Sequence, residues 1–109
     1  MPLSLLLIIQ SYVDASNAHD VSSILACFAD DAVVRDENAS RRGKIEIERW
    51  ARETIDKYNF HFTPLSAEKR GMETVVSIEV SGKFRGSPVM LDYQFTVADE
   101  KISSLTIDS

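Results

Sequence analysis

Asp36 is the residue of this chain whose type and position best suit acid-base chemistry. It ends the stretch NAHDVSSILACFADDAVVRD that starts at Asn17, in which a short amphipathic helix gives way to a short strand. A carboxylate at the mouth of an enclosed pocket can act as a general base, whereas a strand-end aspartate commonly initiates a turn. Asn38 and Ser40, which follow Asp36, favour a turn. The sequence leaves both interpretations open.

Four further side chains are candidates for a pocket. Tyr12 lies on the apolar face of a predicted helix, where a tyrosine is often a core residue with its hydroxyl bonded to the backbone. Trp50 occurs at helical apolar spacing and is expected in the core or in a pocket wall. Tyr93 and Phe95 share the apolar face of an alternating strand, which turns Asp92 to the other face unless a bulge shifts the register.

No pattern for a metal or phosphate site occurs in the sequence. The two histidines and Cys27 show neither HExxH nor paired-cysteine spacing, and there is no glycine-rich phosphate loop. We therefore expect no metal and no cofactor. His19 lies in a turn between two predicted helices, where we expect a solvated or capping residue.

Composition limits the class of protein. With 109 residues, 44% hydrophobic and 27% charged, the chain suits one domain over residues 1–109. The net charge of -5 argues against nucleic acid and anionic membranes as partners. The opening MPLSLLLIIQSYV lacks a basic start and is too short to span a bilayer. The single cysteine excludes an intrachain disulfide and fits a reducing compartment, so we expect a cytoplasmic location.

Hydrophobic spacing predicts helices in the first half of the chain. The first helix ends near Asn17, and its apolar face carries Leu5, Ile8, Ile9, Tyr12 and Val13. Asp20 can cap a second helix. That helix carries Val21, Ile24, Leu25 and Phe28 on one side. A third helix over residues 44–57 follows from the spacing of Ile47, Trp50, Ala51, Thr54 and Tyr58.

Short β-rich segments dominate the remainder of the chain. The first strand is Ala32-Val33-Val34, and the polar stretch DENASRRG after it is expected to be a turn. Four more segments are predicted to pair as hairpins: Phe60–Pro64, Val75–Val80, Val89–Val97 and Ile102–Ile107. Helices followed by an antiparallel meander predict an α+β domain with the helices on one sheet face.

Several short motifs, in this order, resemble the nuclear transport factor 2-like superfamily. They are Tyr12-Val13, Asn17-Ala18-His19-Asp20, Phe28-Ala29-Asp30-Asp31-Ala32, Gly43 and Lys101-Ile102. This superfamily includes ketosteroid isomerases and SnoaL-like polyketide cyclases. The resemblance implies a cone-shaped, cystatin-like fold, in which three N-terminal helices pack on a curved, mostly antiparallel sheet that encloses a pocket. Asp36-Glu37, Trp50, Gly86-Ser87-Pro88 and the Leu91, Tyr93, Phe95 alternation are similar to a small bacterial subgroup with no agreed activity.

Similarity to the ketosteroid isomerases implies roles for three residues. Tyr12 falls at the tyrosine that donates to the developing enolate, Asp36 at the aspartate that moves the proton, and Asp92 near the protonated acid of the oxyanion hole. The chain departs from that pattern at three other positions. Glu37 replaces a common proline, and Phe28 and Ala51 stand where supporting tyrosines occur.

Two classes of function follow. In the first, the chain is a pocket protein that binds a small apolar or carbonyl ligand without chemistry. In the second, it is a cofactor-independent isomerase, lyase or cyclase with Asp36 as base and Tyr12 or Tyr93 as donor. The sheet face away from the helices needs cover, so we also expect a homodimer through that face.

Overall fold

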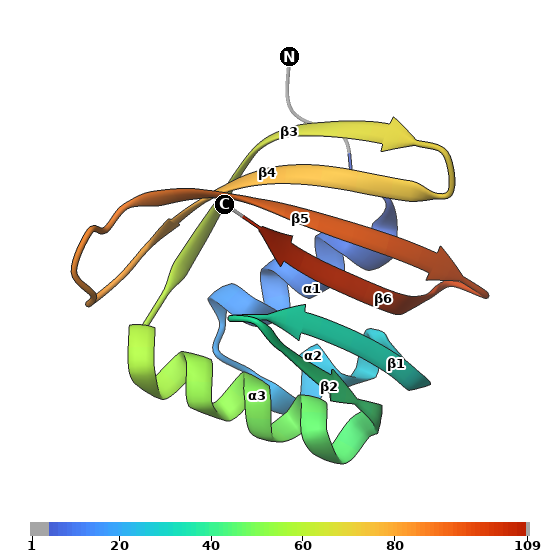
Figure 1. Cartoon of the computed structure of the whole chain (residues 1–109), viewed down its shortest axis with the longest axis horizontal. Coiled ribbons are helices and arrows are strands. Elements are labelled where there is room, and N and C mark those ends of the chain that lie inside the picture. Colours follow the sequence, from blue (N-terminus) through green and yellow to red (C-terminus); the bar gives the residue numbers. More distant parts are fainter. Residues whose placement is uncertain (1–4, 109) are drawn as a thin grey trace.

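A curved sheet of six strands carries the helices of the chain on one face (Figure 1). The computed structural model describes residues 5–108. The elements run in the order α1 (Leu7–Asn17), α2 (Val21–Ala26), β1 (Phe28–Asp36), β2 (Ala39–Arg42), α3 (Gly43–Tyr58), β3 (His61–Arg70), β4 (Glu73–Ser81), β5 (Val89–Ala98) and β6 (Lys101–Asp108).

The strands are arranged in the order β2-β1-β6-β5-β4-β3. Strands β3 to β6 form an antiparallel meander, and β1 joins it by pairing in parallel with β6, with Val34 opposite Leu105. The predicted α+β class and mostly antiparallel sheet are confirmed. The parallel pair brings the C-terminal ends of β1 and β6 together, so Asp36 lies close to the end of the last strand.

The three predicted helices are present with small changes at their ends. Helix α2 is capped by Asp20, whose carboxylate accepts hydrogen bonds from the Ser23 amide at 3.2 Å and hydroxyl at 2.8 Å. Phe28 begins β1 instead of ending this helix. Helix α3 buries the expected apolar stripe except Tyr58, which is half-buried. The helix ends at Tyr58, and Asn59 closes the last turn with a left-handed backbone (φ 45°).

Strand β2 lies within residues 36–43, which the sequence predicts to be a turn. Glu37 and Asn38 both have positive φ (54° and 61°), which is the geometry of a two-residue hairpin turn that pairs Asp36 with Ala39. None of the four residues of β2 is buried, so this edge strand leaves no hydrophobic alternation in the sequence. The turn exists, but it is only two residues long.

The apolar opening of the chain contributes to helix α1. Residues 1–4 lie outside the described residues, and α1 begins at Leu7. Within residues 5–108, no helix is long and apolar enough to cross a membrane.

Aromatic rings packed around Tyr12 join α1 to the sheet. The Tyr12 ring meets Phe95 at 5.6 Å and Phe28 at 5.8 Å between ring centroids, both edge to face. Phe62 and Tyr93 lie at 6.3 and 6.4 Å. Such pairs add about 1 kcal/mol each beyond the area that they bury. This aromatic cluster fixes the helix over the sheet and forms the floor of the space beside it.

The turn after α1 is tied to the start of β3. The Asn17 amide donates to the Phe62 carbonyl oxygen at 3.0 Å, and its oxygen accepts from the Phe62 amide at 2.7 Å. His19 Nε2 lies 2.8 Å from the Phe60 carbonyl oxygen, and its ring packs edge to face on Phe60. The expectation that His19 is a solvated or capping residue is therefore wrong, because its ring is held against β3.

We predict that Asn17→Ala lowers the free energy of unfolding by about 2 kcal/mol, because it leaves two backbone groups of Phe62 without their partner. Urea unfolding measures the change. Gln10→Ala on the same helix is the control. It removes only an exposed hydrogen bond to Asp14, so its expected loss is below about 0.5 kcal/mol. Equal losses for the two variants would contradict the role of Asn17.

Candidate active site in the cavity between helices and sheet

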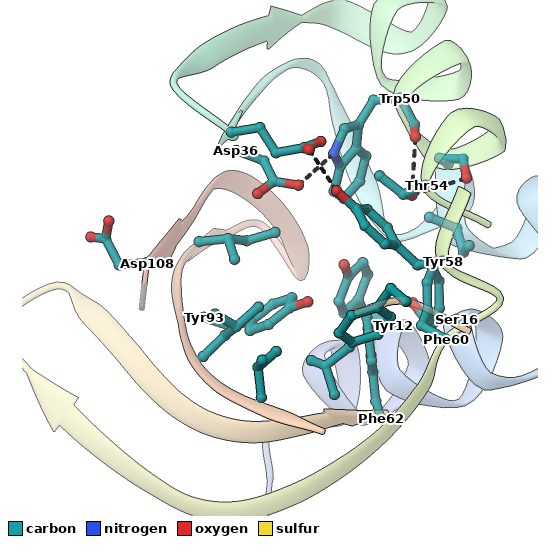
Figure 2. A pocket seen from close by; sticks show the side chains of 18 of the residues that line it. Tyr12, Ser16, Asp36, Trp50, Thr54, Tyr58, Phe60, Phe62, Tyr93 and Asp108 are labelled. Atoms are coloured by element: carbon teal, nitrogen blue, oxygen red, sulfur yellow. Dashed lines mark hydrogen bonds between the residues drawn. The ribbon is translucent and has the colours of Figure 1, made fainter. Parts of the chain in front are cut away.

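A cavity of about 380 Å³ lies between the helices and the sheet (Figure 2). This volume suits a small organic ligand. Most of the lining is apolar and aromatic, and its acidic residues lie at the ends of β1 and β6. The lining residues are Tyr12, Ser16, Ile24, Asp36, Glu37, Asn38, Trp50, Ala51, Thr54, Tyr58, Phe60, Phe62, Val80, Phe84, Val89, Leu91, Tyr93, Ile107 and Asp108.

Asp36 is both a strand-end residue and a cavity residue. Its Oδ2 accepts a hydrogen bond from Trp50 Nε1 at 3.0 Å, and its main-chain oxygen accepts one from Arg41 Nη1 at 2.7 Å. Partial burial raises the pKa of the Asp36 carboxyl; the Trp50 hydrogen bond and the Arg41 charge oppose this shift, and the Glu37 charge adds to it. Asp36 thus both starts a turn and lines the cavity, as the two sequence interpretations describe. Its proton affinity exceeds that of an ordinary aspartate.

The phenols of Tyr12 and Tyr93 extend toward the same cavity as Asp36 (Figure 2). Their side chains are almost fully buried, which raises the pKa of both, and the charge of Asp36 raises both further. The Ser16 hydroxyl partly offsets the shift at Tyr12. Both phenols therefore stay protonated at neutral pH and can donate hydrogen bonds to an oxygen that gains negative charge.

The Tyr93 hydroxyl is notable because no other group within residues 5–108 hydrogen-bonds it. The residue is only 4% exposed, yet no buried polar side-chain atom of the described chain lacks a partner. The hydroxyl therefore reaches open space, which is the cavity. No backbone group in the described range bonds the Tyr12 hydroxyl either, so the expected backbone partner is not found.

Three residues at the rim form a contact that the sequence did not suggest. Tyr58 donates from its hydroxyl to Glu37 Oε2 at 2.6 Å, and Lys57 Nζ lies 3.1 Å from the same oxygen. These contacts, Tyr58 first, lower the pKa of Glu37. Tyr58 also packs edge to face on Phe84. Helical spacing predicts Tyr58 on the apolar face of its helix, but nothing in the sequence indicates its contact with Glu37, which lies 21 residues earlier.

Two of the predicted site residues lie elsewhere. Asp92 is on the outer face of β5, where its carboxylate accepts from the Ser77 hydroxyl at 3.0 Å, and it does not line the cavity. The register shift of β5 falls between Thr96 and Val97, too late to turn Asp92 inward. Phe95 is fully buried beneath Tyr12 and belongs to the floor rather than the lining. Tyr12, Asp36, Trp50 and Tyr93 do line the cavity.

The chemistry available at this site is acid-base chemistry. It combines a half-buried carboxylate of raised pKa with two neutral phenol donors in a mostly apolar space. Within residues 5–108, no group of three or more histidine, cysteine, aspartate or glutamate side chains is placed to hold a metal ion.

The fold with its cavity, together with the family model below, identifies a pocket protein of the nuclear transport factor 2-like superfamily, as the sequence motifs predict. The sequence model of the SnoaL-like domain matches residues 9–105, so the chain belongs to the SnoaL-like family. No curated protein matches the chain.

Solved structures agree with this membership. A candidate polyketide cyclase from Sinorhizobium meliloti is 38% identical, over 95% of both chains, with a TM-score of 0.92. A protein of ketosteroid isomerase-like fold from Catenulispora acidiphila, solved with trimethylamine, is 20% identical over 97% of this chain and 87% of that one, with a TM-score of 0.83. An epoxide hydrolase/cyclase-like enzyme of pyran ring formation in salinomycin is 18% identical over 93% of this chain and 86% of that one, with a TM-score of 0.81. The last two likenesses concern the fold.

We predict that Trp50→Phe raises the pKa of Asp36 further, because the phenyl ring cannot replace the indole hydrogen bond to Oδ2. Carbon-detected NMR titration of the carboxyl groups measures the shift. Tyr58→Phe is the matched variant on the same helix: it removes the donor to Glu37 and should raise the pKa of Glu37 instead. An unchanged Asp36 titration in Trp50→Phe would refute the role of this contact.

Proposed function

We propose that the chain binds a small, mostly apolar carbonyl compound in the cavity and moves a proton on it with side chains alone, as an isomerase, lyase or cyclase. The observation that carries this proposal is the convergence of Asp36, Tyr12 and Tyr93 on one cavity that is otherwise mostly apolar. The mostly apolar walls and the partial burial of Asp36 strengthen each electrostatic contact with a reacting group.

The reaction begins with Asp36 accepting the proton of a carbon next to the carbonyl group. The electrons of the broken C–H bond form an enolate, whose oxygen accepts a hydrogen bond from Tyr12 or Tyr93. Return of the proton from Asp36 to another carbon completes an isomerisation. In an elimination, the enolate expels a leaving group from the next carbon, and that group takes the proton from Asp36. In a cyclisation, the enolate carbon attacks a second carbonyl group, whose oxygen takes the proton from Asp36. A positioned base of this kind contributes about 10²- to 10⁴-fold in rate.

The relatives support this class of reaction. The Sinorhizobium protein, at 38% identity, is named a candidate polyketide cyclase. Cyclisation through an enolate joins the enolate carbon to a carbonyl carbon. Cyclisation is therefore the first of the three outcomes that we would test.

Binding without chemistry is the second candidate, and one observation favours it. The donors around the cavity are fewer than in ketosteroid isomerases, because Phe28 and Ala51 stand at supporting tyrosine positions and Asp92 lies outside. One oxygen of Asp36 is also engaged by Trp50. A carrier of a small apolar molecule would need the cavity but no freely acting base.

Hydrogen-deuterium exchange separates the two candidates without knowledge of the substrate. A panel of small cyclic ketones and diketones is incubated with the protein in D₂O, and NMR follows deuterium entering the carbons next to the carbonyl. We predict catalysed exchange that Asp36→Asn lowers by at least about 10²-fold. The rate should rise with pH through the pKa of Asp36, which burial holds above the ordinary aspartate value, because only the ionised form accepts a proton.

Asp31→Asn is the matched control, since it changes an exposed aspartate of the same strand. It should leave the exchange rate unchanged. Exchange that persists in Asp36→Asn would refute the base, and binding of panel compounds with no exchange in the unaltered protein would favour the carrier.

We also propose a homodimer through the sheet face that the helices leave uncovered (Figure 1). Side chains on the outer face of β4 and β5 support it: Ser77, Gln94 and Thr96 are half-buried, although no helix or strand within residues 5–108 packs over them. Light scattering at micromolar concentration should give twice the mass of the chain. A monomeric mass would refute the proposal.

A cytoplasmic location is part of the same proposal. Cys27 is a free, buried thiol within the described chain, which suits a reducing compartment.

A further inference from the structure

We infer that the ligand of this cavity carries a positively charged nitrogen, such as a protonated amine or an amidinium, at the end that meets Asp36. The inference rests on the proposed function only in placing the ligand in this cavity. It adds the charge of the ligand, which neither the fold nor the proposed proton transfer determines.

Two carboxylates lie at one end of the cavity. Asp36 is the last residue of β1, and Glu37 follows it in the turn to β2. Asp108, at the end of β6, borders the same end, but its carboxylate accepts a hydrogen bond from Gln94 on the outer face of the sheet. Within the described chain, no lysine, arginine or histidine belongs to the lining. Glu37 is paired with Lys57 at the rim, so Asp36 supplies the negative charge inside the cavity, where the mostly apolar walls strengthen its field.

The nearby cations do not neutralise Asp36. Lys57 contacts Glu37 Oε2 and lies 5.0 Å from the centroid of the Tyr58 ring, at the rim. Arg41 donates to the main-chain oxygen of Asp36 and not to its carboxylate. The only side-chain donor to that carboxylate within residues 5–108 is the uncharged Trp50 indole. A half-buried carboxylate without a cation partner loses hydration free energy, and a cationic ligand would supply the missing partner.

Aromatic rings stand where such a cation would be received. Trp50, Tyr12 and Tyr93 line the cavity together with Asp36 (Figure 2). The faces of aromatic rings attract ammonium and guanidinium-like groups, and tryptophan does so most strongly. The Tyr93 hydroxyl, on a side chain only 4% exposed and without a partner in the described chain, can accept a hydrogen bond from an N–H group of the ligand.

A cationic ligand is compatible with proton transfer by Asp36. A positive charge beside the carboxylate offsets part of the burial-raised pKa of Asp36 and favours the ionised form, which is the form that accepts a proton. The ligand would thus keep the base ionised while its own carbonyl group lies against the phenols.

Three compounds of one shape and different charge test the inference: 2-naphthamidine (charge +1), 2-naphthamide (neutral) and 2-naphthoate (charge -1). Isothermal titration calorimetry at neutral pH gives their affinities for the full chain. We expect the amidinium to bind at least tenfold more tightly than the amide, and the naphthoate to bind more weakly than both. Asp36→Asn should reduce the affinity for the amidinium to about that for the amide and leave the amide nearly unchanged.

Glu37→Gln should also reduce the affinity for the amidinium. Glu48→Gln removes an exposed charge from an ion pair on α3 and should leave all three affinities unchanged. An amide or naphthoate that binds as tightly as the amidinium overturns the inference, and so does an absence of amidinium binding. The deuterium exchange uses uncharged ketones, so its result is independent of this test. Equal affinities for the three naphthalene compounds, together with Asp36-dependent exchange, would overturn the inferred ligand charge and leave the proposed proton transfer intact.

Discussion

The parallel pairing of β1 with β6 is the constraint on which the rest of the structure depends. It is the one parallel contact in the described sheet, and it joins the strand that follows the helices to the strand that ends the meander. Because parallel strands end on the same side, Asp36 is carried to the edge of the cavity that the meander and the helices enclose. The short hairpin to β2 then turns the chain toward α3, whose Trp50 reaches back to the Asp36 carboxylate.

The same aromatic residues serve both the core and the site. Tyr12 packs against four other rings, yet its phenol extends into the cavity together with that of Tyr93. Helix α1 is thereby fixed by the contacts that also orient a donor. Asn17, at the end of this helix, holds the backbone of Phe62, which lines the cavity. A change in the packing of α1 therefore changes the shape of the site.

Burial of Asp36 works against the stability of the fold at neutral pH. Its pKa is higher in the folded chain than in the unfolded chain, so the folded state binds the proton more tightly. Stability from this group is greatest below the unfolded pKa and decreases as the pH rises through the folded pKa. The contribution of Glu37 to stability has the opposite pH dependence, since its contacts with Tyr58 and Lys57 lower its pKa. Adjacent residues on one turn thus differ because one faces the cavity and the other the rim.

The sequence by itself determined the helices, the meander and the alternation of β5, because these depend on spacing within one element. That alternation correctly predicted that Tyr93 faces inward and Asp92 outward, against the role that the resemblance implied for Asp92. Only the tertiary structure decided the edge strand β2, the parallel pair and the contacts of His19, Trp50 and Tyr58 with distant residues. The physical reason is range: periodicity records which face of an element is buried, whereas the partner across a cavity is set by how separate elements pack.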